Sequence, residues 1–474
     1  SWLSTTSTAA NSISGIFAIE DHSSIPITSA PSGASTAFDN TPVTFAATED
    51  QGASGGTASF TPTTEPSPSA AGNNYAFTAT CGTSSDGPFY ITATTGSSAA
   101  GISAGQLAGL PTPLAYPTSP PNTAAMQRYS CANGDIAVST LYSSNYTTSK
   151  VGAYTVNAST GVPSAVTGQP YTASTNPLGM VTTPNGSFLY VANSGTDTIS
   201  GYSITAATGA LTAITGSPFA LDHATSRPFA LAVTPNGSFL YASDSSAFNA
   251  LNCYKINSST GALTLLATPT YAVSTTPHGI AITPNGSFLY VANFGTTTIS
   301  GFSINASTGA LTAITGSPFS AGAGSKPDFL ATNGTYLYAS DNGLNHLSGF
   351  SINGSTGALT ALASSPYTTG TGPQAVTYDA TGAYLYAVNN TSGSVSAYSI
   401  NSSTGALTQL SGSPYTVGTS PVGATVSGSF LYVANSGSSS VSGFKITAGA
   451  GTLTTLAGSP FSISGSGVED VIVR

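Results

Sequence analysis

Few side chains of this 474-residue chain can move protons or bind a metal, and they are scattered along the sequence. The four histidines, His22, His223, His278 and His346, show neither HxH nor HExxH spacing. There is no GxSxG nucleophile elbow with recognisable partners and no P-loop. The frequent Asn-Gly pairs are turn formers rather than phosphate cradles. We therefore predict no catalytic residue, no metal and no cofactor from motifs alone.

One set of ionisable and polar residues is placed regularly. In the tandem repeat described below, these residues lie just before or at the start of the first strand of a unit. If the units close into a ring, this end of the strand faces the mouth of the central channel. The candidates for a ligand site at this mouth are Arg227, His278, Lys326, Asp328, Gln374, Glu469 and Asp470. The alternative, that solvated loops at the mouth simply tolerate charge, stays open.

Composition excludes several classes of function. The chain has 7 Lys+Arg and 16 Asp+Glu, a net charge of −9, and only 5% charged residues. So few basic residues cannot neutralise a nucleic-acid backbone or hold an anionic membrane surface. No apolar run is long enough to span a bilayer. The 23 Tyr and 20 Phe can build a core, and the abundance of Gly, Thr and Ser disfavours a helical protein.

The repeat fills the C-terminal three quarters of the chain. One unit runs from Asn176 to Phe219, and the aromatic residue of its third strand recurs about every 48 residues. The period within a unit is two, and PNG, NSG and ATG turns separate short strands. The seven recurring aromatics are Tyr154, Tyr202, Tyr254, Phe302, Phe350, Tyr398 and Phe444. Seven units of four short strands predict an all-β, seven-bladed propeller.

A propeller ring must close, and the C-terminus supplies a strand for this. Val468 to Val473 aligns with the first strand of a unit, so we expect it to be the innermost strand of the first blade. The alternative is that residues 127–131 supply that strand. In each unit, a small residue before the aromatic is expected to let adjacent sheets approach, while the aromatic fills the gap between blades. Cys253 occupies one of these small positions and is expected to be inert packing.

Some of the repeat motifs also carry a family resemblance. YVAN at Tyr190–Asn193, Tyr290–Asn293 and Tyr432–Asn435 follows TPNGSFL or SGSFL. These motifs resemble the YVTN or lactonase-like seven-bladed β-propeller repeats, over about residues 126–474. The resemblance implies a seven-bladed propeller. It also implies either a surface or secreted protein or a hydrolase of sugar lactones.

The N-terminal region does not repeat. We expect an extension at 1–19, a small β-sandwich-like domain at 20–107, a Pro-rich linker at 108–125 and the propeller at 126–474. The extension could be donated to a neighbouring protomer or could be the sandwich's own first strand. Cys81 and Cys131 could form a disulfide in an oxidising compartment or remain free thiols. The chain begins at Ser1, from which we expect an exported protein whose signal has been removed.

Two further sets of residues recur in the turns. Asn193, Asp244, Asn293, Asp341, Asn389 and Asn435 end the second strand of their units and are expected to cap the following turn, with a calcium role as the alternative. N-x-S/T sequons offer possible glycosylation sites, although a repeated Asn-Gly-Ser turn creates them without selection for sugar. They begin at Asn145, Asn157, Asn185, Asn236, Asn257, Asn285, Asn305, Asn333, Asn353, Asn389, Asn390 and Asn401.

The scarcity of ionisable groups favours a non-enzymatic function. We expect an extracellular or cell-surface structural or adhesive protein that self-associates, in its sharper form the subunit of a filament joined by terminal-strand donation. The alternatives are a secreted lactonase-like hydrolase with its site at the channel mouth, and a carbohydrate-binding surface propeller. No nucleic-acid partner and no membrane span is expected.

Overall fold

The computed structural model describes residues 139–463, 465 and 467–474 in full, together with the backbone of nine short strands nearer the N-terminus. The chain divides into two compact units, Ser1–Ala137 and Val138–Arg474. All regular secondary structure among the described residues is β-strand. In this part of the chain no helix is long and apolar enough to cross a bilayer.

The N-terminal unit contains two antiparallel sheets. The strand β2 pairs with both β1 and β8 of the same chain, and whether the extension at 1–19 is donated to a neighbour stays a prediction. The side chains of this unit lie outside the described residues. The sandwich, the linker at 108–125 and the Cys81–Cys131 disulfide therefore remain predictions. One sheet contains β1 (Ser4–Ser7), β2 (Ile13–Phe17), β8 (Gly87–Thr95), β4 (Val43–Glu49) and β6 (Thr64–Glu65), with β9 (Ser130–Cys131) beside β8, and the other contains β3 (Ile25–Ser29), β7 (Tyr75–Cys81) and β5 (Ala58–Thr61).

The second unit is a seven-bladed β-propeller, as the repeat predicts. Its seven antiparallel sheets, here blades 1 to 7, each present one innermost strand to the channel, and each innermost strand contacts the next around the ring. In blade order the innermost strands are β43 (Val468–Val473), β14 (Pro177–Thr182), β19 (Pro228–Val233), β23 (Pro277–Ile282), β28 (Pro327–Thr332), β33 (Pro373–Tyr378) and β38 (Pro421–Ser427).

The second and third strands of each blade form the buried body of the sheet. In blade order the second strands are β10 (Thr140–Asn145), β15 (Phe188–Asn193), β20 (Phe239–Asp244), β24 (Phe288–Asn293), β29 (Tyr336–Asp341), β34 (Tyr384–Asn389) and β39 (Phe430–Asn435). The third strands are β11 (Lys150–Val156), β16 (Thr198–Ile204), β21 (Ala250–Ile256), β25 (Thr298–Ile304), β30 (His346–Ile352), β35 (Ser394–Ile400) and β40 (Ser440–Ile446).

The outer edge of a blade is one long strand or two short ones. In blade 3 it is the single strand β22 (Leu263–Ala272), and in every other blade two short strands pair with successive parts of the third strand. These pairs are β12 (Pro163–Ala165) and β13 (Tyr171–Thr172), β17 (Leu211–Ala213) and β18 (Phe219–Ala220), β26 (Leu311–Ala313) and β27 (Phe319–Ser320), β31 (Leu359–Ala361) and β32 (Tyr367–Thr368), β36 (Leu407–Gln409) and β37 (Tyr415–Thr416), and β41 (Leu453–Thr455) and β42 (Phe461–Ser462).

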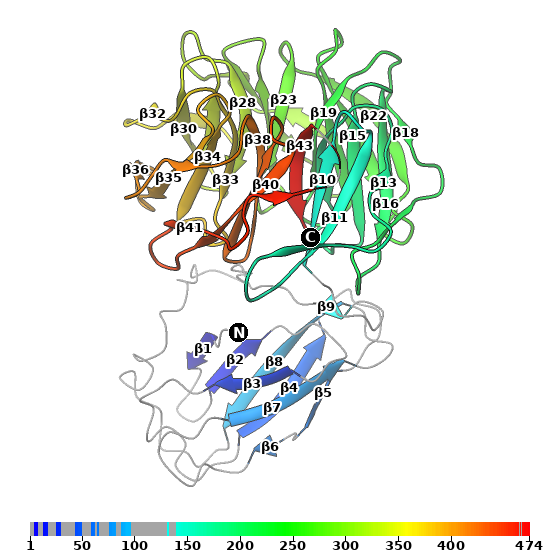
Figure 1. Cartoon of the computed structure of the whole chain (residues 1–474), viewed down its shortest axis with the longest axis vertical. Coiled ribbons are helices and arrows are strands. Elements are labelled where there is room, and N and C mark those ends of the chain that lie inside the picture. The colour runs from blue at the N-terminus through cyan, green and yellow to red at the C-terminus, as the bar shows by residue number, and fades with distance from the viewer. Residues whose placement is uncertain are drawn as a thin grey trace. The chain divides into compact units, whose positions relative to one another are not determined.

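The C-terminal strand closes the ring. Figure 1 shows β43, at the red end of the colour scale, beside β10, with which it pairs antiparallel from Leu141↔Val473 onward. Blade 1 is therefore built from both ends of the propeller sequence, as the alignment of Val468 to Val473 predicts. The alternative is wrong, because β9 within residues 127–131 pairs with β8 instead.

A tyrosine on each second strand ties its blade to the next. In the YVAN motif of blade 7, the buried Tyr432 donates its hydroxyl to the carbonyl of Gly161 in blade 1 at 2.6 Å, across the point of closure. Tyr241 makes the equivalent bond from blade 3 to Gly309 in blade 4, at 2.8 Å. Gly309 has a φ of 71°, and a Cβ there would lie 2.4 Å from the Phe239 ring, so the turn accepts only glycine. The TGA turn and the aromatic second strand thus form one interlock, repeated around the ring.

The small residues before the third-strand aromatics have a different role from the expected one. A Cβ on Gly201 would lie 2.9 Å from the Phe219 ring, so the missing side chain admits an aromatic of the same blade rather than the adjacent sheet. The aromatic itself does bridge blades, since Tyr202 of blade 2 donates its hydroxyl to the carbonyl of Thr172 in blade 1. Cys253 is fully buried in a hydrophobic cluster, and burial raises its thiol pKa, which agrees with inert packing.

Candidate functional site

The innermost strands place one residue each in a common ring. Six of them begin with a proline that pairs with the last residue of the second strand, and β43 begins with Val468 opposite Asn145. The following residue of each strand therefore has the same register in all blades. This mouth ring consists, in blade order, of Glu469, Leu178, Phe229, His278, Asp328, Gln374 and Val422.

The mouth ring brings two of the predicted site residues into direct contact. His278 of blade 4 and Asp328 of blade 5 lie 2.8 Å apart, from Nδ1 to Oδ1. The side chain of Asp328 is 3% exposed and that of His278 is 14% exposed. A carboxylate can only accept this hydrogen bond, so Nδ1 carries the proton when the imidazole is neutral. The imidazole of His278 then has an unprotonated Nε2, the form that a general base requires.

Aromatic rings cover both faces of His278. Phe229 of blade 3 stacks on one face with centroids 3.9 Å apart and an interplanar angle of 8°. Phe294, in the turn after β24, stacks on the imidazole at 4.6 Å and 12°. Together with the bond to Asp328, this stacking leaves the Nε2 edge of the imidazole as its route to a ligand. Neither phenylalanine was expected at the site from the sequence.

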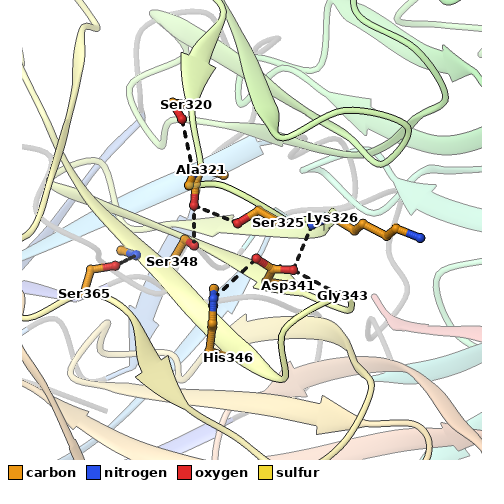
Figure 2. Close-up of polar contacts among 11 residues, drawn as sticks. Ser320, Ala321, Ser325, Lys326, Asp341, Gly343, His346, Ser348 and Ser365 are labelled. Carbon is orange, nitrogen blue, oxygen red and sulfur yellow. Dashed lines mark hydrogen bonds and ion pairs between the residues drawn. The ribbon is translucent and has the colours of Figure 1, made fainter.

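Two exposed cations flank blade 4. Arg227 and Lys326 immediately precede the innermost strands of blades 3 and 5, and both are exposed. Figure 2 shows that Asp341 receives the backbone N–H of Lys326, at 2.8 Å, while the side chain extends away from this carboxylate. The Lys326 ammonium lies 5.7 Å from the centroid of the Phe294 ring, a cation–π arrangement. Lys326 thus brings a positive group to the phenylalanine that stacks on His278, and Arg227 lies two residues before Phe229 of the mouth ring.

Two other predicted residues, Gln374 and Glu469, also belong to the mouth ring. Oε1 of Gln374 is buried and has no hydrogen-bond partner. Glu469, in blade 1, accepts a hydrogen bond from Ser436 Oγ at 3.0 Å. Burial raises the pKa of Glu469, and the bond from Ser436 opposes this rise. The ring therefore carries a carboxyl group with an elevated pKa three blades away from the imidazole.

Asp470, also predicted as a mouth residue, has a structural role. It follows Glu469 on the strand and accepts the backbone N–H of Met180, in blade 2, at 2.9 Å. Burial of its carboxyl group raises the pKa of Asp470 to about 7, and this backbone bond opposes the rise. Asp470 therefore links blades 1 and 2 beneath the mouth ring.

The predicted second set of residues braces the turns that follow the second strands. Asp341 Oδ1 accepts the backbone N–H of Gly343, and the side-chain Oδ2 lies 3.6 Å from His346 Nε2 (Figure 2). The asparagine members act differently. Asn193, for example, donates its Nδ2 to Thr198 Oγ1 and to Ser200 Oγ across the hairpin. Within residues 139–463, 465 and 467–474, no group of three or more His, Cys, Asp or Glu side chains could hold a metal ion.

The sequons fall into structurally distinct groups. Asn145 and Asn389 are completely buried, which excludes both as glycan acceptors in the folded protein. Asn157 is exposed, and its Oδ1 accepts the backbone N–H groups of Ser159 and Thr160. The same side-chain turn recurs at Asn257, Asn305, Asn353 and Asn401. Glycosylation of the exposed asparagines remains a prediction.

Comparison with known proteins identifies the family. The family described as "Lactonase, 7-bladed beta-propeller" matches residues 105–229, 220–325 and 329–422. This chain belongs to that family. No curated protein sequence matches it significantly.

Solved structures have the same fold. A Bacteroides fragilis protein named for 6-phosphogluconolactonase activity is 21% identical, with a TM-score of 0.62 over 71% of this chain and 98% of its own. The periplasmic gluconolactonase of Pseudomonas aeruginosa is 18% identical, with a TM-score of 0.59 over 71% of this chain and 99% of its own. At these identities the likeness shows the fold alone.

These findings correct the function predicted from the sequence. The scarcity of ionisable groups led to a non-enzymatic structural or adhesive protein, assembled into a filament by strand donation. Membership of a lactonase family overturns that prediction and favours the hydrolase alternative. The error has a physical reason: acid–base chemistry on a small substrate needs only a few converging groups, so a low total charge does not exclude it.

Proposed function

We propose that this protein hydrolyses a lactone of a sugar acid at the mouth ring, with His278 as the general base. The observation that carries the proposal is the 2.8 Å contact between His278 Nδ1 and Asp328 Oδ1 in this ring. Family membership supports the reaction class, and the lactonase names of the two structural relatives support the substrate class.

The reaction follows from the orientation of the imidazole. Nε2 of His278 removes a proton from a water molecule as the water oxygen attacks the lactone carbonyl carbon. The tetrahedral intermediate then collapses and the bond from the carbonyl carbon to the ring oxygen breaks. The imidazolium returns its proton to that oxygen, giving a hydroxy acid. Asp328 holds the productive tautomer and stabilises the transient positive charge, as a carboxylate does for histidine in hydrolytic triads.

The two cations bear on the choice of substrate. Arg227 and Lys326 are exposed on either side of blade 4, where they could hold an anionic substituent of the lactone. A phosphorylated sugar lactone would use both charges, whereas an unphosphorylated one would not. Comparison of the two substrates in the wild-type protein and in an Arg227→Ala/Lys326→Ala double variant separates these cases, because only the phosphorylated substrate should lose affinity.

The test of the proposal replaces His278 by the residue found at the equivalent position of another blade. Blade 2 has Leu178 at the register position of His278, so His278→Leu keeps a side chain that this ring already accommodates. Ring opening of glucono-δ-lactone and its 6-phosphate is followed in weakly buffered solution by proton release, with the spontaneous rate subtracted. The proposal predicts wild-type turnover of at least one substrate and loss of it in His278→Leu. The proposal would be overturned if the wild type hydrolysed neither lactone, or if the wild type and His278→Leu hydrolysed them at equal rates.

A further inference from the structure

The two most similar blades of the propeller differ at the site. Blades 2 and 4 share the second-strand sequence FLYVAN and the preceding PNGS turn, yet Leu178 is replaced by His278 and Ser194 by Phe294. In blade 2, Ser194 Oγ donates a hydrogen bond to the carbonyl of Asn176 at 3.0 Å. Phenylalanine cannot make this bond. Blade 4 therefore gives up a stabilising turn contact at the same place where it gains a histidine.

The geometry of Phe294 shows what replaces the lost bond. Its ring lies nearly parallel to the imidazole of His278, 4.6 Å away and at 12°, on the face opposite Phe229. The two stacks restrict tilting of the imidazole plane, and the Nδ1 bond to Asp328 restricts rotation within that plane. Three contacts from three blades thus aim the Nε2 lone pair in a single direction.

Each phenylalanine also contacts a residue of blade 5. The ammonium of Lys326, from blade 5, lies 5.7 Å from the Phe294 centroid. Phe329, also of blade 5, packs against Phe229 with centroids 5.9 Å apart at a tilt of 47°. The stack on His278 is therefore joined by contacts to residues of blades 3, 4 and 5.

We infer that Phe294 and Phe229 form a clamp that positions the imidazole of His278, with Phe294 as the element that blade 4 acquired for this purpose. The inference rests on the proposed function, since the clamp serves a general base. Phe294 is a positioning residue: it acts through His278 and need not touch the substrate. Misplacing a catalytic group by about 1 Å can cost about a hundredfold in rate. Loss of the clamp should therefore lower kcat strongly and change the affinity for substrate much less.

The kinetic test replaces Phe294 by the serine of blade 2. Phe294→Ser should lower kcat by about 10- to 100-fold and change KM less than about threefold. Phe294→Tyr, which keeps a planar ring, should restore most of kcat. The matched control is Ser194→Phe in blade 2, which introduces the same ring beside a leucine and should leave kcat unchanged. Wild-type kcat in Phe294→Ser, or no rescue by Phe294→Tyr, would overturn the clamp.

A spectroscopic test decides the clamp independently of catalysis. The protein has four histidines, so selective ¹⁵N-histidine labelling gives a simple spectrum in which His278→Leu identifies the signals of His278. The wild type should show one tautomer with the proton on Nδ1 and a single set of shifts. Phe294→Ser should broaden or average these shifts, whereas Ser194→Phe should not. Identical His278 signals in wild type and Phe294→Ser would overturn the clamp, even if the protein proved inactive on sugar lactones.

Discussion

Asp328→Asn is the substitution that distinguishes a role of the His278–Asp328 contact in acid–base catalysis from a purely structural role. Asparagine matches aspartate in size, so packing at this 3% exposed side chain is preserved while the negative charge is lost. Its amide can present N–H to His278 Nδ1, which would move the imidazole proton to Nε2 and disable the base. Even with the carbonyl facing the ring, the charge that stabilises the imidazolium is absent.

The size of the effect follows from that single contact. A positioned general base contributes about 10²- to 10⁴-fold to a rate, which corresponds to about 3–5 kcal/mol of transition-state stabilisation at 1.36 kcal/mol per factor of ten. Because the 2.8 Å bond fixes both tautomer and charge, we expect Asp328→Asn to lower kcat/KM of lactone opening within this range. The loss should fall mainly on kcat, since Asp328 faces the histidine rather than the channel.

The assay is proton release on lactone opening, with thermal unfolding of each variant as a check of folding. Asp244→Asn is the matched control, because Asn193 in blade 2 has the same register at the end of the second strand. It should keep wild-type kcat. A folded Asp328→Asn variant with at least a third of the wild-type kcat/KM would refute the assignment of His278 as a general base supported by Asp328.

Two further predictions concern stability. The pKa of Asp470 is raised from 3.8 to about 7, so the unfolded chain loses this proton near pH 4 and the folded chain keeps it until near pH 7. The free energy of unfolding should therefore fall by about 4 kcal/mol between those pH values and level off above them. Urea midpoints at pH 4.5 and 8 should show this fall in the wild type and much less of it in Asp470→Asn; equal falls would contradict the burial of this carboxyl. Gly279→Ala would place a Cβ 2.7 Å from the Cα of Phe329, so it should lower the unfolding free energy by about 1–3 kcal/mol, whereas Gly354→Ala, with nothing within 4 Å, should change it by less than about 0.5 kcal/mol. Equal thermal midpoints for the two alanine variants would show that the inner strands are not closely packed at Gly279.

The propeller was predictable because its signal is repeated. One blade, such as residues 176–219, has turn glycines and a period of two, but seven in register specify both the sheets and their number. The closure by Val468–Val473 was predictable for the same reason, since a ring with a missing first strand needs one from the other terminus. The role of Gly201 was misassigned, because sequence shows that a position is small but not which neighbour fills the space.

The candidate site was only half predictable. The repeat register brought His278 and Asp328 to the same ring, yet their direct contact depends on the spacing between blades 4 and 5. It also grouped Asp470 with them, although this side chain is directed toward blade 2. The sequence does contain a signal for Phe294, because it replaces the serine of blade 2 in a turn whose next two residues, Gly and Thr, are the same in both blades. Positions at which one blade differs from the other copies of the repeat thus indicate candidate functional residues, and finding them requires no homologous sequence.

The position of the reaction product tests the central claim most directly. A crystal soaked with gluconate or 6-phosphogluconate should show the carboxylate at the mouth ring, with an oxygen about 3 Å from His278 Nε2 or joined to it through one water. Arg227 and Lys326 would flank the phosphate in the second case. A product bound elsewhere on the propeller, with the mouth ring empty in the same crystal, would contradict the account.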